Sequence, residues 1–144
     1  MREIRFRAWD EDYKYMNHKV MVGNVWDEEN YHAHMIWVDR KDVDYECESG
    51  WMNFDEHSNI EIMQYTGLKD KNGVGIYEGD VVKGSYYAGY NVGIKRIIGS
   101  VGWASASFKV NGVKQYEGTI VGLDGSFEVI GNIYENPELL GDSQ

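Results

Sequence analysis

The chain has 144 residues, 42% of them hydrophobic and 14% aromatic, which is enough for a packed core and excludes a wholly disordered protein. Its single cysteine, Cys47, excludes an intrachain disulfide and with it the disulfide-stapled class of secreted domains. The formal net charge is −10, and residues 1–66 carry most of it, with 7 Lys and Arg against 15 Asp and Glu, which argues against general nucleic-acid binding.

The apolar runs are only a few residues long, so no membrane-spanning segment is expected. Charged residues occupy the start of the chain, where a signal peptide needs an apolar stretch. These features predict a soluble, cytoplasmic protein. Its acidic surface would favour solubility, and it could also meet a basic partner.

Short alternating stretches and 17 glycines against one proline are typical of a mainly β chain. In the first half, apolar and polar side chains alternate over residues 4–9, and further strands are expected at 19–25, 32–38 and 60–65. Residues 39–50 are charged and poorly patterned, which predicts an exposed, mobile loop. The segment 1–67 is therefore expected to be a mainly β region with a long acidic loop.

The second half is expected to hold strands around residues 81–83, 94–103, 107–110, 119–121 and 127–134, separated by glycine turns. Residues 84–93, rich in glycine and tyrosine, are interpreted as a long loop. Asn136 at a cap and Pro137 at the first helical position predict a short C-terminal helical turn. Short strands that close on themselves remove exposed sheet edges, so residues 68–144 are expected to form a small barrel domain.

Aromatic and basic residues gather in the least acidic part of the chain, between residues 83 and 103. Exposed aromatics on a small β domain can form a groove for a peptide or stack on nucleic-acid bases. The alternative is that these rings pack as core and lid. The candidate binding residues are Tyr86, Tyr87, Tyr90, Lys95, Arg96 and Trp103, with Lys83 close by in the sequence.

His32 and His34 are two residues apart, so on a strand both rings point to one side. Together with Cys47 or His57 they are weak candidates for a metal site, against the alternative of solvent-facing histidines on an edge strand. The sequence lacks the nucleophile and phosphate-loop motifs of common enzyme classes, so no catalytic residue and no cofactor are expected.

Four segments of the chain carry a family resemblance. Two of them lie in the middle of the chain, QYTGLKDKNG at residues 64–73 and IYEGDVV at residues 76–82. The opening REIRFRAWD at residues 2–10 and the ending VIGNIYENPELL at residues 129–140 complete the pattern. With these segments the sequence resembles the YopX family of phage and prophage proteins. Val74 and Gly75 depart from the expected polar pattern, and residues 27–55 match nothing in it.

The resemblance implies an SH3-type barrel in the C-terminal part and a mostly β N-terminal part, in a protein that acts inside a bacterial host. The resemblance implies no activity, cofactor or ligand. The residues of the family signature are therefore expected to determine the fold, through turns and close backbone approach. These residues are Tyr65, Thr66, Gly67, Leu68, Asp70, Gly73, Tyr77, Gly79, Asp80, Gly131 and Asn132.

Three hypotheses follow for the function. The favoured one is a non-catalytic binding or accessory protein that contacts an unidentified phage or host protein. The second is a nucleic-acid accessory protein that uses the same aromatics with Lys83, Lys95 and Arg96. The third is a metal-dependent enzyme built on His32 and His34. Self-association through an edge strand or aromatic patch is also expected.

Overall fold

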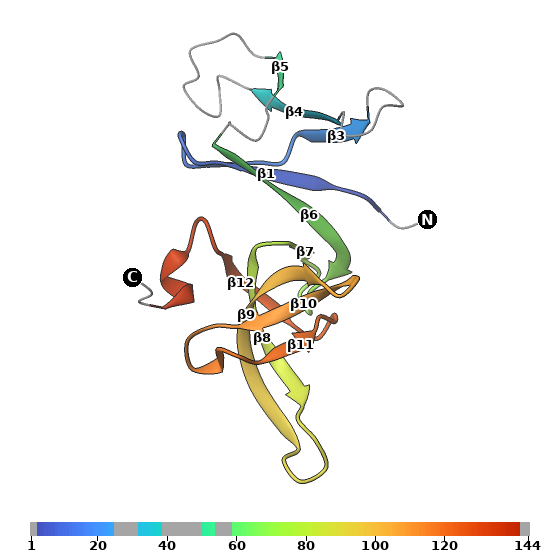
Figure 1. Ribbon diagram of the computed structural model, residues 1–144, viewed down its shortest axis with the longest axis vertical. Helices are drawn as coiled ribbons and strands as arrows, with labels where there is room; N and C mark the ends of the chain where they lie inside the picture. The colour runs from blue at the N-terminus through green and yellow to red at the C-terminus, as the bar shows by residue number, and fades with distance from the viewer. Residues whose placement is uncertain (1–2, 25–31, 39–49, 54–58, 142–144) are drawn as a thin grey trace. The chain divides into compact units, whose positions relative to one another are not determined.

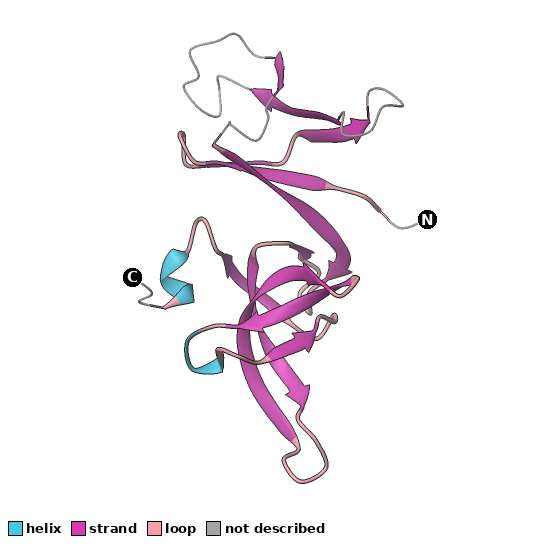
Figure 2. Cartoon of the chain, viewed as in Figure 1, coloured by secondary structure: helices cyan, strands magenta, loops and turns pink. Residues whose placement is uncertain are grey.

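The structure is a computed structural model that describes residues 3–24, 32–38, 50–53 and 59–141 (Figures 1 and 2). Its regular structure is almost entirely antiparallel β, with curved sheets, which confirms the predicted mainly β fold. Contacts divide the chain into two units, Ile4–Gln64 and a second one that holds Glu3 and the described residues from Tyr65 onward. Within the described residues, no helix has the length and apolar character needed to cross a membrane.

The first unit contains two small sheets. Its elements are β1 (Phe6–Asp10), β2 (Tyr15–Asn17), β3 (Val20–Asn24), β4 (His32–Val38), β5 (Gly50–Asn53) and the first part of β6 (Ile60–Lys69). β1 lies between β2 and β6, while β4 lies between β3 and β5. Strands thus occur at all four positions predicted for this half, and most of the expected acidic loop, residues 39–49, lies outside the described residues.

The turn between β1 and β2 is organised by one aspartate. Asp10 is buried, and its Oδ1 accepts the backbone N–H groups of Asp12 at 3.0 Å and Tyr13 at 3.1 Å. Short polar side chains of this kind stabilise turns by replacing a backbone acceptor. The beginning of the chain therefore folds back on itself through a local side-chain contact.

β6 belongs to both units, because its first part pairs with β1 and Tyr65 pairs with Tyr77 of β7 (Gly75–Tyr77). The sequence predicts that this strand ends near Tyr65, whereas it extends to Lys69. The turn begins only at Asp70, whose N–H donates to the Val74 carbonyl at 2.7 Å. Residues 66–69 are part of the strand because β6 pairs with β7 from Tyr65 to Lys69.

The second unit is built on a five-stranded antiparallel sheet with the order β11-β10-β9-β8-β12. The strands are β8 (Asp80–Tyr87), β9 (Ile94–Ala104), β10 (Ser107–Gly112), β11 (Ile120–Gly122) and β12 (Glu128–Asn132), and a 3-10 turn η1 (Lys114–Tyr116) follows β10. The buried core consists of Ile76, Val82, Ile97, Val101, Val110 and Phe127. β9 supplies two of these residues, Ile97 and Val101, which are four positions apart and therefore lie on one face of the strand.

A close approach between Gly84 and Phe127 joins β8 to the residue before β12. A Cβ atom on Gly84 would lie only 2.5 Å from the Phe127 ring, and that ring is almost completely buried. Glycine is therefore needed here because the ring occupies the space of a side chain. Gly84 lies within the segment that the sequence predicts to be a loop, but it is part of β8.

The chain ends in a 3-10 turn, η2 (Pro137–Leu140), so the expected helical turn is present only in this tighter form. Asn136 makes no side-chain cap to it, which corrects the predicted capping role. Its Oδ1 instead accepts the backbone N–H of Asn132 at 3.2 Å. The short polar side chain holds the end of β12 against the turn rather than starting a helix.

Candidate binding surface on the β8–β9 hairpin

The strands β8 and β9 form a hairpin that extends beyond the rest of its sheet (Figure 1). β12 pairs with β8 only as far as Lys83, and β10 pairs with β9 only from Gly99 onward. We call residues 84–97, which lie between these limits, the hairpin arm. The arm is closed by a hydrogen bond from the Ala88 N–H to the Gly93 carbonyl at 2.8 Å.

One side of the arm carries Ser85 and Tyr87 from β8 with Arg96 and Ile94 from β9. Ser85 pairs with Arg96 and Tyr87 pairs with Ile94 in the strand register. Directly paired residues of an antiparallel ladder lie on the same face, and residues two apart along a strand share that face. We call this side of the arm the pocket face.

The opposite side of the arm carries Tyr86 and Lys95, which also pair with each other. Tyr86 is half-buried and packs against the core of the second unit, whereas Lys95 is exposed. The sequence interpretation grouped Lys95 with Arg96, and the structure places these two neighbours on opposite faces of one strand.

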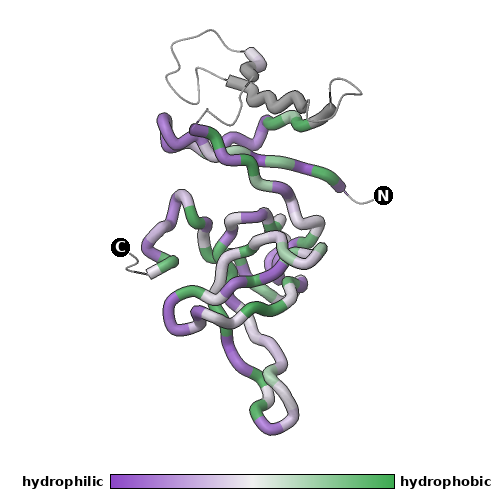
Figure 3. Tube along the Cα trace, in the orientation of Figure 1, coloured by the Kyte–Doolittle hydropathy of each residue, from purple (hydrophilic) through white to green (hydrophobic). Residues whose placement is uncertain are grey.

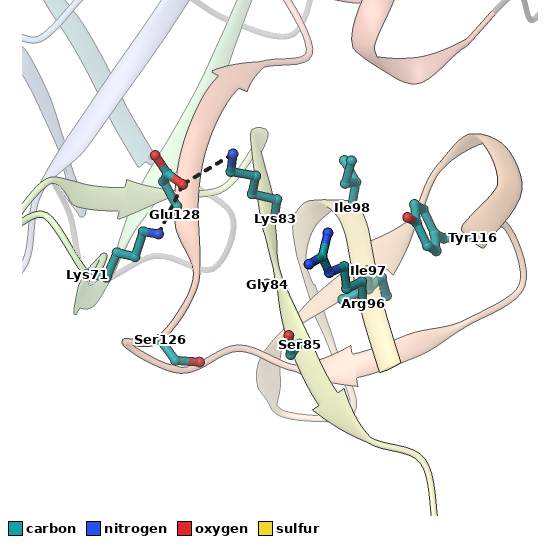
Figure 4. Close-up of a pocket in the computed structure, with 10 residues that line it drawn as sticks. All are labelled: Lys71, Lys83, Gly84, Ser85, Arg96, Ile97, Ile98, Tyr116, Ser126 and Glu128. Atoms are coloured by element: carbon teal, nitrogen blue, oxygen red, sulfur yellow. Dashed lines mark ion pairs between the residues drawn. The ribbon is translucent and has the colours of Figure 1, made fainter. Parts of the chain in front are cut away.

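A pocket of about 480 Å³ lies along the pocket face (Figure 4). Figure 4 shows Lys83 and Ser85 on one strand and Arg96 and Ile98 on the next, with Glu128 approaching from β12. The lining residues are Lys71, Lys83, Gly84, Ser85, Arg96, Ile97, Ile98, Tyr116, Ser126 and Glu128. Five separate stretches of the chain therefore line one concave site, and each of them brings a polar group to it, as ligand pockets usually require.

The charges in the pocket are unequal, with three cations against the single carboxylate of Glu128. Glu128 forms ion pairs with Lys71 at 3.3 Å and Lys83 at 3.5 Å. The hydrogen bond from Lys71 is the main cause that holds the pKa of Glu128 below its ordinary value, and the charges of Lys71 and Lys83 add to it. Within the described part of the chain, Arg96 has no hydrogen bond or ion pair, so the pocket retains a free guanidinium.

Large apolar side chains are exposed together near the end of the arm. The exposed fractions are 65% for Tyr87, 94% for Tyr90, 54% for Val92 and 71% for Ile94. Figure 3 marks hydrophobic positions in this part of the hairpin. Apolar residues scattered singly over a surface are ordinary, but a contiguous group on a projecting hairpin is typical of a contact surface.

Trp103, the remaining candidate, lies on β9 beyond the arm and pairs with Phe108 of β10. Its ring is 56% exposed and meets the Phe108 ring edge-on, with 4.7 Å between centroids. The structure therefore brings Tyr87 and Arg96 to the pocket face, but Tyr86, Lys95 and Trp103 do not lie on it.

Sequence reasoning did not identify Lys71, Ser126 and Glu128 as members of the site. Lys71 lies in the turn after β6, and the other two flank Phe127 near the start of β12. The register that pairs Glu128 with Lys83 creates this proximity. No local pattern around residue 128 indicates which lysine its carboxylate will meet.

Several signature residues secure the segment from β6 to β8. Tyr65 and Tyr77 pair across the strands with ring centroids 5.3 Å apart. The Thr66 hydroxyl donates to the Ile76 carbonyl at 2.7 Å and accepts the Leu68 N–H at 3.2 Å, while Gly67 has a positive φ of 85°. These contacts satisfy buried polar groups, which would otherwise cost stability.

The remaining signature residues also act on the backbone. Asp80 Oδ2 accepts the Tyr77 N–H at 2.8 Å, and Asn132 Oδ1 accepts the Tyr134 and Glu135 N–H groups at 3.1 and 2.8 Å. Asp70 bonds three backbone N–H groups, and its turn includes Gly73, whose φ is 82°. Gly79 donates its N–H to the Val101 carbonyl, and Gly131 packs close to Asn136 and Leu139. These remaining signature residues lie at turns or close to the ends of strands.

The predicted metal site falls largely outside the described residues. Cys47 and His57 are among the residues that the structure does not describe, and of His32 and His34 only the strand positions on β4 are described. Among the residues described, no group of three or more potential metal ligands comes together. The metal-dependent hypothesis therefore stays a prediction.

Comparison with known proteins places the chain in a family. The fold is similar to the crystal structure of protein EF1440 from Enterococcus faecalis, with a TM-score of 0.53 and 28% sequence identity over 97% of this chain and 99% of that one. A search of curated proteins found no match. The sequence pattern of the YopX protein family matches residues 5–141. Because this match covers nearly the whole chain, the protein belongs to the YopX family.

Proposed function

We propose that this protein is a non-catalytic binding or accessory protein that contacts another protein through the hairpin arm. The observation that carries the proposal is the exposure of four large apolar residues, Tyr87, Tyr90, Val92 and Ile94, within one short stretch of a strongly acidic chain. Such groups lose contact with water when a partner covers them, and aromatic residues are enriched in protein interfaces.

The proposed setting is the cytoplasm of a bacterial host that carries the gene on a phage or prophage. This follows from the resemblance of the chain to phage and prophage proteins. We further infer that residues 68–144 form an SH3-like barrel domain and residues 1–67 a mainly β region with an acidic loop. In this arrangement the domain would supply a rigid base for the arm, and a rigid base lowers the entropy cost of binding.

One observation favours nucleic acid as a second candidate partner. Tyr87 is exposed on the same face as Arg96, and Lys83 continues that face along β8. An exposed ring beside cations can stack on a base while the cations contact phosphates. The net charge of −10 and the engagement of Lys83 by Glu128 weigh against this candidate.

The test compares two isoleucine variants of the tagged full-length chain, expressed in its bacterial host. Ile94 is 71% exposed on the arm, and Ile120 is 63% exposed on β11, so Ile120→Ser is a matched control for Ile94→Ser. We expect Ile94→Ser to lose the co-purifying protein, while Ile120→Ser and nuclease treatment leave it bound.

Circular dichroism and unfolding curves establish that both variants are folded. Equal recovery of the partner by the two variants would contradict a contact through the arm. Loss of all co-purifying material on nuclease treatment would instead support the nucleic-acid candidate. Self-association, which the exposed apolar group also favours, is measured by sedimentation of the purified chain over a range of concentrations.

A further inference from the structure

The arm has an open backbone edge beside its pocket. The bond between the Ala88 N–H and the Gly93 carbonyl sets the alternation of the β8–β9 ladder. In an antiparallel pair, every second residue directs its N–H and C=O away from the partner strand. Ser85 and Tyr87 are those residues on β8, and within the described part of the chain no strand pairs with β8 beyond Lys83 on that side.

The other strand supports this assignment. The same alternation directs the Ile98 carbonyl away from β8, and that carbonyl accepts the Val113 N–H at 2.9 Å. By contrast, the outward N–H and C=O groups of Ser85 and Tyr87 have no hydrogen-bond partner among the described residues. An unpaired strand edge is a template for an added strand from another chain.

The pocket beside this edge selects for negative charge. It holds Lys71, Lys83 and Arg96 against the single carboxylate of Glu128, in a chain whose net charge is −10. Figure 4 shows Ser85 on the arm and Ser126 across the pocket from it, and each carries a hydroxyl group. Both lysines already contact Glu128, so Arg96 is the cation that is free for an incoming anion.

We propose that the partner docks as an extended acidic segment that adds a strand to the outer edge of β8 and places a carboxylate against Arg96. This inference rests on the proposed function and names the chemistry of its partner. Main-chain bonds to Ser85 and Tyr87 supply affinity, and alternate side chains of the segment reach the pocket. The exposed ring of Tyr87 lies next along the same face and covers an apolar residue of the segment.

A peptide is favoured over a polyanion by the amount of positive charge. A pocket with a surplus of two cations matches one or two carboxylates, whereas a nucleic acid needs a track of cations to release its counterions. A guanidinium also binds a carboxylate through two parallel hydrogen bonds, which gives the contact a defined geometry.

The experiment titrates the full-length chain with a short peptide that alternates valine with glutamate, and with a control peptide that has glutamine in place of glutamate. Binding is followed by fluorescence anisotropy and by the backbone amide resonances of the protein. We expect the glutamate peptide to bind about tenfold more tightly than the control and to shift the amides of Ser85 and Tyr87. Its affinity should fall as salt is added.

Two neighbouring cations provide the matched variants. Arg96→Gln removes the charge on the pocket face, and Lys95→Gln removes a charge from the opposite face of the same strand. We expect Arg96→Gln to weaken binding of the glutamate peptide about tenfold and Lys95→Gln to leave it within about twofold. Both side chains are exposed, so neither change should alter the amide spectrum away from its own site.

The inference would be overturned by equal affinity for the two peptides or by equal effects of the two variants. It would also be overturned if the Ser85 and Tyr87 amides did not shift up to the highest peptide concentration, or if they shifted only because the protein self-associates. An oligonucleotide that shifts those amides while the peptide does not would also overturn it, in favour of nucleic acid. If any of these occurs while the partner is still lost from Ile94→Ser and not from Ile120→Ser, the proposed function stands and only the inference fails. If partner recovery does not depend on Ile94, the proposed function fails.

Discussion

The carboxylate of Asp70 accepts the backbone N–H of Val129, which lies 59 residues later in the chain, at 3.0 Å. The other oxygen of the same carboxylate accepts the N–H groups of Asn72 at 2.8 Å and Val74 at 2.9 Å. One nearly buried side chain therefore shapes the turn after β6 and attaches that turn to β12. Through β12 it also supports Glu128 at the edge of the pocket.

Replacement of Asp70 by asparagine tests this linkage. Asp70→Asn puts an amide donor against backbone donors, so we expect the free energy of unfolding to fall by about 1–3 kcal/mol. Asp124→Asn is the control, because Asp124 is exposed and, among the described residues, its Oδ1 accepts hydrogen bonds only from groups of Ser126. Urea unfolding at neutral pH measures both changes, and equal losses in the two variants would show that the contact with Val129 contributes nothing.

The same carboxylate predicts a pH dependence. Burial opposes the ionisation of Asp70, but the hydrogen bonds from Val129, Val74 and Asn72, with the charge of Lys71, outweigh it and hold its pKa below the ordinary value. A group with a lowered pKa in the folded state stabilises the fold above its unfolded pKa of about 3.9. That contribution is lost as the pH falls below about 4 and through the lowered folded value.

We therefore expect the stability of the natural chain to decrease over this acidic range, with a smaller decrease in Asp70→Asn. Unfolding curves recorded in steps from neutral pH downward measure the difference between the two proteins. Parallel curves for the two would show that Asp70 does not carry the linkage.

Close packing of Phe127 on Gly84 predicts a second stability effect. In Gly84→Ala the added methyl group would lie 2.5 Å from a buried ring, so we expect a loss of about 1–3 kcal/mol in the free energy of unfolding. Gly122 is the control, since a Cβ there meets nothing within 4 Å, and Gly122→Ala should raise stability by about 0.5 kcal/mol. Unchanged stability in Gly84→Ala would mean that the Phe127 ring moves aside without cost.

The turn between β9 and β10 offers a stabilising change. Ser105 and Ala106 connect Ala104 to its partner Ser107, and their φ angles are 50° and 63°. Two central residues with positive φ favour asparagine followed by glycine. The double variant Ser105→Asn/Ala106→Gly is expected to raise the free energy of unfolding by about 1 kcal/mol.

Urea unfolding measures this gain, and the slope with denaturant should not change. Ser105→Pro is the opposing control, because proline cannot adopt positive φ and must lower stability. A double variant no more stable than the natural chain would contradict the turn geometry.

Local patterns in the sequence were sufficient for several of the strands and turns. Alternation over residues 4–9 predicted β1, and apolar residues bounded by glycine turns predicted β9 at residues 94–103. These inferences succeed because strand alternation and turn geometry depend on neighbours in the chain. The interpretation of residues 84–93 as a loop was wrong for residues 84–87 for the same reason, since these belong to β8 through their pairing with residues 94–97 of β9.

The candidate site was decided by the tertiary structure. The sequence alone determined a mainly β, acidic member of the YopX family with aromatic and basic residues between positions 83 and 103. The pairing of β12 with β8 placed Glu128 against Lys83, and the alternation of β9 separated Arg96 from Lys95. Because register joins residues that are far apart in the chain, and a shift of one residue reverses every face, no local pattern could assign the pocket.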